Sequence, residues 1–146
     1  MKINIEVQEG IEDTVVTIRC KEHNAQIDRL VAAMLVIDRR MTVFCEGHMA
    51  ELDLEKVLYI ESVDRKCFVY TGEKVYESCN KLYELEQQLE QYLFARINKA
   101  CVVNLKNVES IKTYIDRRLL MTLINGERLV VSRQYAEGIK ALLGFR

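Results

Sequence analysis

The chain has 146 residues, of which 49% are hydrophobic and 29% charged, as expected for one folded domain with or without a small appendage. It has neither the run of about 18 apolar residues of a membrane-spanning helix nor an apolar signal peptide, so we expect a cytoplasmic protein. The formal net charge of −1 conceals a basic segment, residues 96–133, whose eight Lys/Arg against three Asp/Glu suit either a nucleic-acid face or a solvated edge.

The first forty residues predict a ββα unit. Residues 2–8 and 14–19 alternate apolar and polar side chains, as half-buried strands do. In residues 24–39 the apolar period changes to that of one helical face, with Asn24 as the N-cap. The helical face expected to pack inward consists of Ile27, Leu30, Val31, Met34 and Leu35.

The rest of the chain is rich in predicted strands. They cover residues 41–47, 57–62, 67–71, 74–79, 94–104, 108–115, 118–124 and 128–133. Asn125-Gly126, between two of them, is the strongest hairpin signal in the sequence. The pattern predicts an α+β fold that is mostly β, with small antiparallel sheets preceded by the ββα unit.

Two further helices are predicted in this strand-rich part. Residues 81–93 are amphipathic, with an inward face of Leu82, Leu85, Leu89 and Tyr92. Ser132 can cap a last helix that Gly144 ends. We therefore divide the chain into a regulatory or dimerisation unit, residues 1–40, and a second domain, residues 41–146.

Both histidines follow a cysteine by three residues, which offers an alternative function. Cys20 with His23 and Cys45 with His48 could together ligate zinc in a metal-sensing module. The spacing differs from the usual C-x-x-C with H-x₃₋₅-H, and each cysteine ends a predicted strand, where it can point inward as a small apolar residue. The five cysteines are an odd number without a disulfide-framework spacing, which favours reduced thiols. Because the spacing of the two pairs is unusual for zinc, we expect no bound metal.

The sequence does not favour an enzyme. It contains no Gly-rich phosphate loop, no G-x-S-x-G and no H-E-x-x-H motif. We therefore expect no catalytic residues, no cofactor and no small-molecule substrate. A small-molecule-sensing or protein-interaction module without DNA binding remains the alternative.

Polar residues cluster at three junctions between predicted elements. The clusters are Asp64-Arg65-Lys66, then Arg96 with Asn98 and Lys99, and finally Ser132-Arg133-Gln134. Arg and Lys suit guanine or phosphate, and Asn and Gln suit adenine, so these residue types can recognise DNA. Any one cluster could equally be a satisfied turn, but three of them favour a nucleic-acid-binding face.

These motifs resemble the LytTR family of DNA-binding domains in bacterial transcription regulators. The resemblance runs from about Met41 to Leu143. It rests on LYIESVDRKCFVYT, the leucine-rich helix, FARINKACVVNLKNV, the Asn-Gly hairpin and LVVSRQY. The most specific parts are the central F-x-R-x-x-K-A-x-x-V-N and the terminal V-S-R.

The resemblance implies a sequence-specific regulator of double-stranded DNA that has no recognition helix. Loops at sheet edges enter successive major grooves, often at direct repeats, and bend the DNA. The family includes short members, and the resemblance implies that a partner governs them, often a small membrane protein that sequesters them. We also expect a homodimer, with the 24–39 helix as a docking or dimerisation surface.

Carried over by position, the resemblance implies a set of DNA-binding residues. The set is Arg65, Lys66, Cys67, Arg96, Asn98, Lys99, Lys106 and Arg133. Within it, phosphate contacts are expected from Arg96, Lys99 and Lys106, and base contacts from Lys66, Asn98, Lys99 and Arg133. Cys67 departs from the polar side chain that suits its position, so Lys66 is expected to take over that contact.

Overall fold

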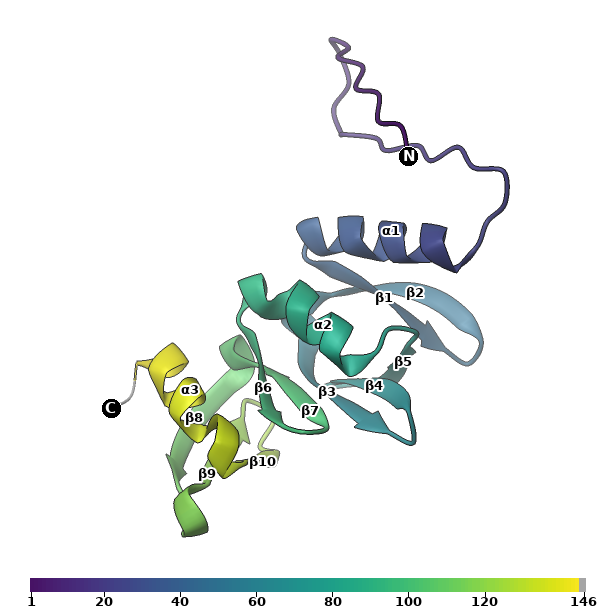
Figure 1. The fold of residues 1–146 in the computed structure, drawn as a ribbon. Coiled ribbons are helices and arrows are strands. Elements are labelled where there is room, and N and C mark those ends of the chain that lie inside the picture. The colour runs from purple at the N-terminus through teal and green to yellow at the C-terminus, as the bar shows by residue number, and fades with distance from the viewer. Residues whose placement is uncertain (145–146) are drawn as a thin grey trace.

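The computed structural model describes residues 1–144, and from Ala25 onward they form two antiparallel sheets and three helices (Figure 1). The larger sheet has the order β2-β1-β5-β4-β3-β7-β6, and the smaller sheet has the order β10-β9-β8. The strands of the two sheets are β1 (Arg40–Cys45), β2 (His48–Asp53), β3 (Val57–Val63), β4 (Lys66–Thr71), β5 (Val75–Ser78), β6 (Phe94–Asn98), β7 (Cys101–Asn104), β8 (Val108–Thr113), β9 (Leu119–Leu123) and β10 (Arg128–Val131). The helices are α1 (Ala25–Ile37), α2 (Leu82–Leu89) and α3 (Arg133–Leu143). The predicted α+β, mostly β fold is confirmed.

Two apolar cores hold these elements together. The first lies between the larger sheet and the helices α1 and α2, and includes Val36, Val43, Ile60, Leu85 and Leu89. The second joins the larger sheet to the smaller sheet and α3, and includes Ile97, Val103, Met121 and Ile139. Successive residues of β7 serve different cores, because Val102 packs in the first and Val103 in the second. The apolar run in this strand therefore reflects burial on both faces.

Local signals fix the ends of the helices. Asn24 caps α1, because its side-chain oxygen accepts a hydrogen bond from the backbone N–H of Ile27 at 3.2 Å. At the start of α2, the Glu84 carboxylate accepts from the backbone N–H of Lys81 at 3.2 Å. Gly144 ends α3 with a left-handed φ of 77°. The predicted caps at Asn24 and Gly144 are confirmed.

Helix α1 is less buried than its sequence predicts. Only Val36 is fully buried, and Val36 is not on the predicted inward face. Val31, which is on that face, is exposed. Since Val36 shares the first core with Met41 of β1, the helix packs on the larger sheet. The division of the chain at residue 40 stays a prediction.

The two strands expected in residues 2–8 and 14–19 are wrong. Residues 1–24 contain no strand, and all but Ile18 are exposed. Alternating apolar residues show which face a strand would bury, but a strand also needs a neighbouring backbone, and none is present here. We call residues 1–22 the arm; it leads away from the folded body beyond α1 (Figure 1).

Among residues 1–144, no helix is both long and apolar enough to cross a bilayer.

Candidate nucleic-acid interface

Two of the three predicted polar clusters lie side by side at one end of the larger sheet. In the β3–β4 hairpin, Val63 pairs with Lys66 across the turn. The turn between β6 and β7 lies next to it, because β3 also pairs with β7 and the backbone N–H of Ser62 donates to the carbonyl of Ala100 at 2.8 Å. The pairing of strands therefore brings both turns to the same end.

The third cluster joins them from the outer edge of β6. The backbone N–H of Ser132 donates to the carbonyl of Ile97 at 2.9 Å, and the Ser132 hydroxyl donates to the same carbonyl at 3.3 Å. These bonds fasten the junction of β10 and α3 beside the β6–β7 turn. A shallow hollow between the two is lined by Asn98, Lys99, Ala100, Ser132, Arg133 and Gln134. We call residues 64–66, 98–100 and 132–134 together the connector end.

The β6–β7 turn is held rigidly and leaves Lys99 exposed. The Asn98 side-chain oxygen accepts from the backbone N–H of Ala100 at 2.9 Å. This bond shapes the turn and leaves the amide nitrogen of Asn98 as the group free to donate to a ligand. Lys99 contributes an exposed cation beside it.

Arg96 supports this turn from behind. Its side chain is only 14% exposed, and its guanidinium donates to the carbonyl of Lys99 at 2.7 Å and to Glu86 at 3.0 Å. Arg96 Nε is the one buried side-chain nitrogen or oxygen in residues 1–144 without a hydrogen-bond partner. The guanidinium group of Arg96 thus makes its hydrogen bonds within the protein. This geometry favours a role in positioning the turn over the predicted phosphate contact.

The β3–β4 turn presents two cations and conceals a thiol. Asp64 and Arg65 both adopt left-handed backbone conformations, with φ of 50° and 67°, which makes the tight turn. Arg65 and Lys66 are exposed. Cys67 points the other way and is only 4% exposed in the first core, where burial raises the pKa of its thiol. Because neighbouring strand residues face opposite sides, Cys67 faces the core while Lys66 faces solvent, and this burial does not favour the predicted contact of Cys67 with DNA.

Arg133 and Gln134 are the first two residues of α3, and both are exposed. The first backbone N–H groups of a helix have no partner within it and favour anions. The Ser132 side chain makes no capping bond to them. Gln134, which lines the hollow, was not part of the predicted DNA-binding set, although its position in the V-S-R-Q sequence could have indicated it.

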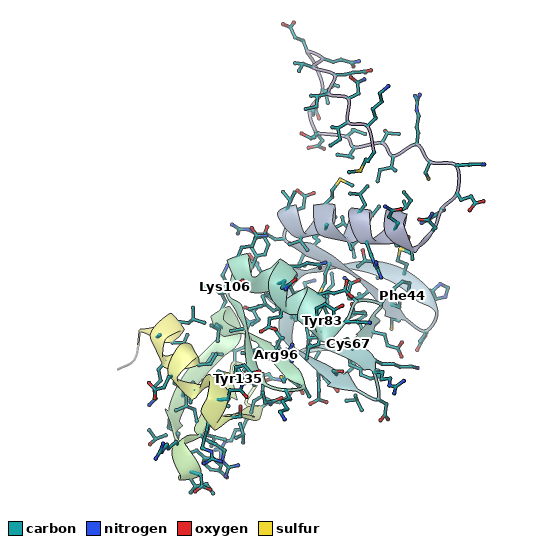
Figure 2. The ribbon with its side chains drawn as sticks, viewed as in Figure 1. Phe44, Cys67, Tyr83, Arg96, Lys106 and Tyr135 are labelled. Atoms are coloured by element: carbon teal, nitrogen blue, oxygen red, sulfur yellow. The ribbon has the colours of Figure 1, made fainter. Side chains whose placement is uncertain are left out.

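Lys106 does not lie at the connector end. It belongs to the 3-10 turn Leu105–Asn107, which follows β7 at the opposite end of the β6–β7 hairpin. Figure 2 shows Lys106 well apart from Arg96. Lys106 lines a small crevice together with Arg39, Glu55 and Tyr92, among others. We call residues 104–107 the opposite end.

Two asparagines of the V-N-L-x-N-V sequence have a structural function that the motif alone does not reveal. Asn104 is 1% exposed; its amide donates to the carbonyls of Leu54 and Val57, and its side-chain oxygen accepts from the backbone N–H of Lys106. The Asn107 amide donates to the carbonyls of Glu55 and Val57. These bonds fasten the opposite end to the 3-10 turn Leu54–Lys56 and to the first residue of β3.

The two Cys-x-x-His pairs do not form a metal site in the part of the chain that the structure describes. No three His, Cys, Asp or Glu side chains come together there. His23 instead contacts the Asp28 carboxylate at 2.6 Å. All five cysteines are free thiols.

The amino-acid sequence matches one family model. Residues 47–144 match the model described as the LytTr DNA-binding domain, which is not an enzyme. Among solved structures, the LytTr DNA-binding domain of a Bacillus cereus protein described as a methyl-accepting/DNA response regulator is similar, with a TM-score of 0.69 and 29% identity. The similarity covers 73% of this chain and 98% of that domain.

Similar full-length proteins fall into two groups. The sensory transduction protein LytT of Bacillus cereus is 28% identical over 98 residues, which are 67% of this chain and 40% of LytT. This chain therefore spans about two fifths of that relative's length. A Staphylococcus aureus protein described as an uncharacterized HTH-type transcriptional regulator is 23% identical over 145 residues, 98% of each chain. In this chain strands separate α1, α2 and α3, so the term helix-turn-helix (HTH) does not describe its fold.

Proposed function

The chain belongs to the LytTR family of DNA-binding domains, and from that premise we propose that it is a transcription regulator that binds double-stranded DNA sequence-specifically through the connector end. The observation that carries the proposal is the convergence of three separate polar segments on one end of the molecule. The similar Staphylococcus protein, which matches over nearly its whole length, supports a role in transcription.

The cations at this end provide the electrostatic part of binding. Arg65, Lys66, Lys99 and Arg133 are all exposed there. Each phosphate that such a side chain neutralises releases counterions, which makes the affinity dependent on salt. The first N–H groups of α3 add partial positive charge next to Arg133.

Base recognition is assigned to the same end. We expect Arg133 and Lys66 to contact guanine and the free amide nitrogen of Asn98 to donate to a base acceptor. Because the oxygen of Asn98 already accepts from Ala100, we expect a single hydrogen bond from Asn98 rather than the bidentate pair with adenine.

The order of the connectors supports contacts in two successive grooves. Lys66 and Arg133 lie on opposite sides of the β6–β7 turn, since β3–β4 flanks β7 and the start of α3 flanks β6. Successive major grooves on one side of a duplex are about 34 Å apart. The connector end is narrower than that, because neighbouring strands are only about 5 Å apart. We therefore propose that the DNA bends toward the protein, and that paired copies bind direct repeats.

Selection of bound fragments from random duplexes at two salt concentrations tests this function. We expect one enriched sequence that persists at the higher salt concentration. Two double variants are compared. Each loses two cations, one variant at the connector end and the other away from it. Lys99→Ala/Arg133→Ala should abolish the enrichment, whereas Lys106→Ala/Arg128→Ala should retain it. Arg128 is an exposed arginine at the far end of β10 from Arg133. Equal enrichment by both double variants would refute the assigned end, and no enrichment by the unmodified protein would refute sequence-specific binding.

A further inference from the structure

The arm carries a set of apolar side chains that nothing covers. The exposed ones are Met1, Ile3, Ile5, Val7, Ile11, Val15 and Val16. Ile5 is 82% exposed and Val7 93% exposed. In residues 1–144, no hydrogen bond or ion pair links the arm to the rest of the protein. Monomeric proteins rarely expose so many apolar side chains in one segment.

A second uncovered apolar surface lies on α1, directly after the arm. Residues 30–37 read LVAAMLVI, eight consecutive apolar residues, so this part of the helix is apolar on every side. Such helices are normally buried all round. Here the larger sheet covers one side, and Val31 and Ile37 remain exposed, Ile37 at 73%. The outer side of α1 therefore has the composition of an interface.

The alternation within the arm matches this surface. If Val7 pairs with Val16 and Ile5 with Ile18, a hairpin results whose one face carries all four apolar side chains. Residues directly opposite each other in an antiparallel pair share a face. Gly10, with a φ of 87°, lies in the connecting segment, where a left-handed residue helps the chain to turn. The other face would carry polar residues such as Asn4 and Thr17.

We propose that the arm of one copy of this chain folds into a hairpin on the outer side of α1 of a second copy, and the reverse. The arrangement satisfies the symmetry of a dimer, because each copy contributes the same two surfaces. The exposed arm side chains on that face are Met1, Ile3, Ile5, Val7 and Val16. At about 100 Å² apiece, these five from each copy would remove on the order of 1,000 Å² of apolar surface from water, to which the covered surface of α1 adds, and this reaches the lower limit for a specific interface.

One observation favours a second copy over the chain's own α1: the arm leads away from α1 in the single chain and leaves the outer side of that helix uncovered (Figure 1). Charge favours docking on α1 as such: the arm carries five Asp/Glu against three Lys/Arg, whereas residues 25–40 carry three arginines against two aspartates. The inference does not depend on DNA binding.

Sedimentation equilibrium of the full chain tests the dimer. We expect a mass twice the 17.0 kDa of one chain. Ile5→Asp should raise the dimer Kd by about 100-fold or more, because it buries an unpaired carboxylate. The neighbouring Asn4→Asp places the same charge on the polar face and should leave the Kd within about threefold. The helical signal in circular dichroism should be unchanged in both variants, since both side chains lie outside the folded part of the chain, which begins at Ala25. A monomeric unmodified protein, or a dimer insensitive to Ile5→Asp, would overturn the proposal.

Cross-linking distinguishes exchange between copies from folding within one. A photo-reactive benzoylphenylalanine replaces Ile5 in protein grown in ¹⁴N, which is mixed with unsubstituted ¹⁵N protein. We expect a cross-linked peptide that joins a light arm to a heavy α1. Adducts formed only between a light arm and a light α1 would show that the arm covers its own helix, and adducts outside α1 would show a different docking surface. Either result overturns the proposal.

Discussion

At the connector end of the β6–β7 hairpin, Asn98 and Lys99 form a turn that solvent reaches, whereas at the opposite end Asn104 is buried and Lys106 follows it in a 3-10 turn. Both ends thus contain an asparagine and a lysine of one continuous stretch, FARINKACVVNLKNV. Asn98 makes one bond within its own turn, whereas Asn104 makes two bonds to distant backbone carbonyls and one to the N–H of Lys106. The same residue type therefore serves a ligand-facing surface at one end and the stability of the fold at the other.

The largest expected effect separates the two asparagines. Asn104→Ala should lower the free energy of unfolding by about 2–3 kcal/mol, because it removes all three hydrogen bonds of a buried side chain. Asn98→Ala should cost less than about 1 kcal/mol, since it removes one bond in an accessible turn. Urea denaturation measures both. Binding to the selected duplex should show the reverse order once the folded fraction is taken into account. Equal losses of stability would mean that the two ends do not differ in this way.

Arg133→Ala tests base recognition at the connector end. We expect an affinity loss of about 1–3 kcal/mol for the selected site, with a relaxed preference at one base pair, because a bidentate contact with guanine is lost. Arg128→Ala is the control, with the same substitution at the far end of β10. Fluorescence anisotropy on the selected duplex and its single-base variants measures both. A loss shared equally by every duplex would assign Arg133 to phosphate instead.

Arg96→Met tests whether the connector end depends on support from behind. The variant keeps an unbranched apolar stem and removes the bonds to the carbonyl of Lys99 and to Glu86. We expect a stability loss of about 1–2 kcal/mol and a weaker affinity, without a change in the salt dependence of binding. If Arg96 contacts phosphate, as the resemblance implies, the slope of log K against log salt should instead fall by about one.

The smallest effect compares the two lysines. Lys99→Ala should reduce the slope of log K against log salt by about one, because one phosphate contact is lost. Lys106→Ala should leave that slope unchanged, since Lys106 lies at the opposite end. Titrations at four or more salt concentrations measure both slopes. Should Lys106→Ala also flatten the slope, the duplex would have to extend along the hairpin to residues 104–107.

Much of the fold could be predicted from sequence because its signals are local. The cap at Asn24, the leucine face of α2 and the Asn125-Gly126 hairpin depend on residues a few positions apart. The strands of the arm could not be predicted correctly, because alternation indicates a face but does not supply a partner. The predicted burial of Val31 on α1 fails for the same reason, because an apolar side chain does not by itself supply a covering surface.

The candidate site was predictable as a set of segments but not as a set of side chains. The motif placed residues 64–66, 98–100 and 132–134 at junctions, and strand pairing brings them together. It could not show that Cys67 turns into the core or that Arg96 turns toward Glu86. The direction of Cys67 depends on which positions of β4 face the core. The direction of Arg96 depends on the packing of β6 against α2.

The left-handed conformation of Arg65 sets stability and activity against each other. An ordinary L-residue in that conformation costs about 1–2 kcal/mol, and glycine adopts it freely. A laboratory screen for heat resistance would therefore tend to enrich Arg65→Gly, a substitution that also discards a cation next to Lys66. Variants selected only for stability would tend to bind their ligand with lower affinity. A useful screen must therefore select for stability and affinity at once.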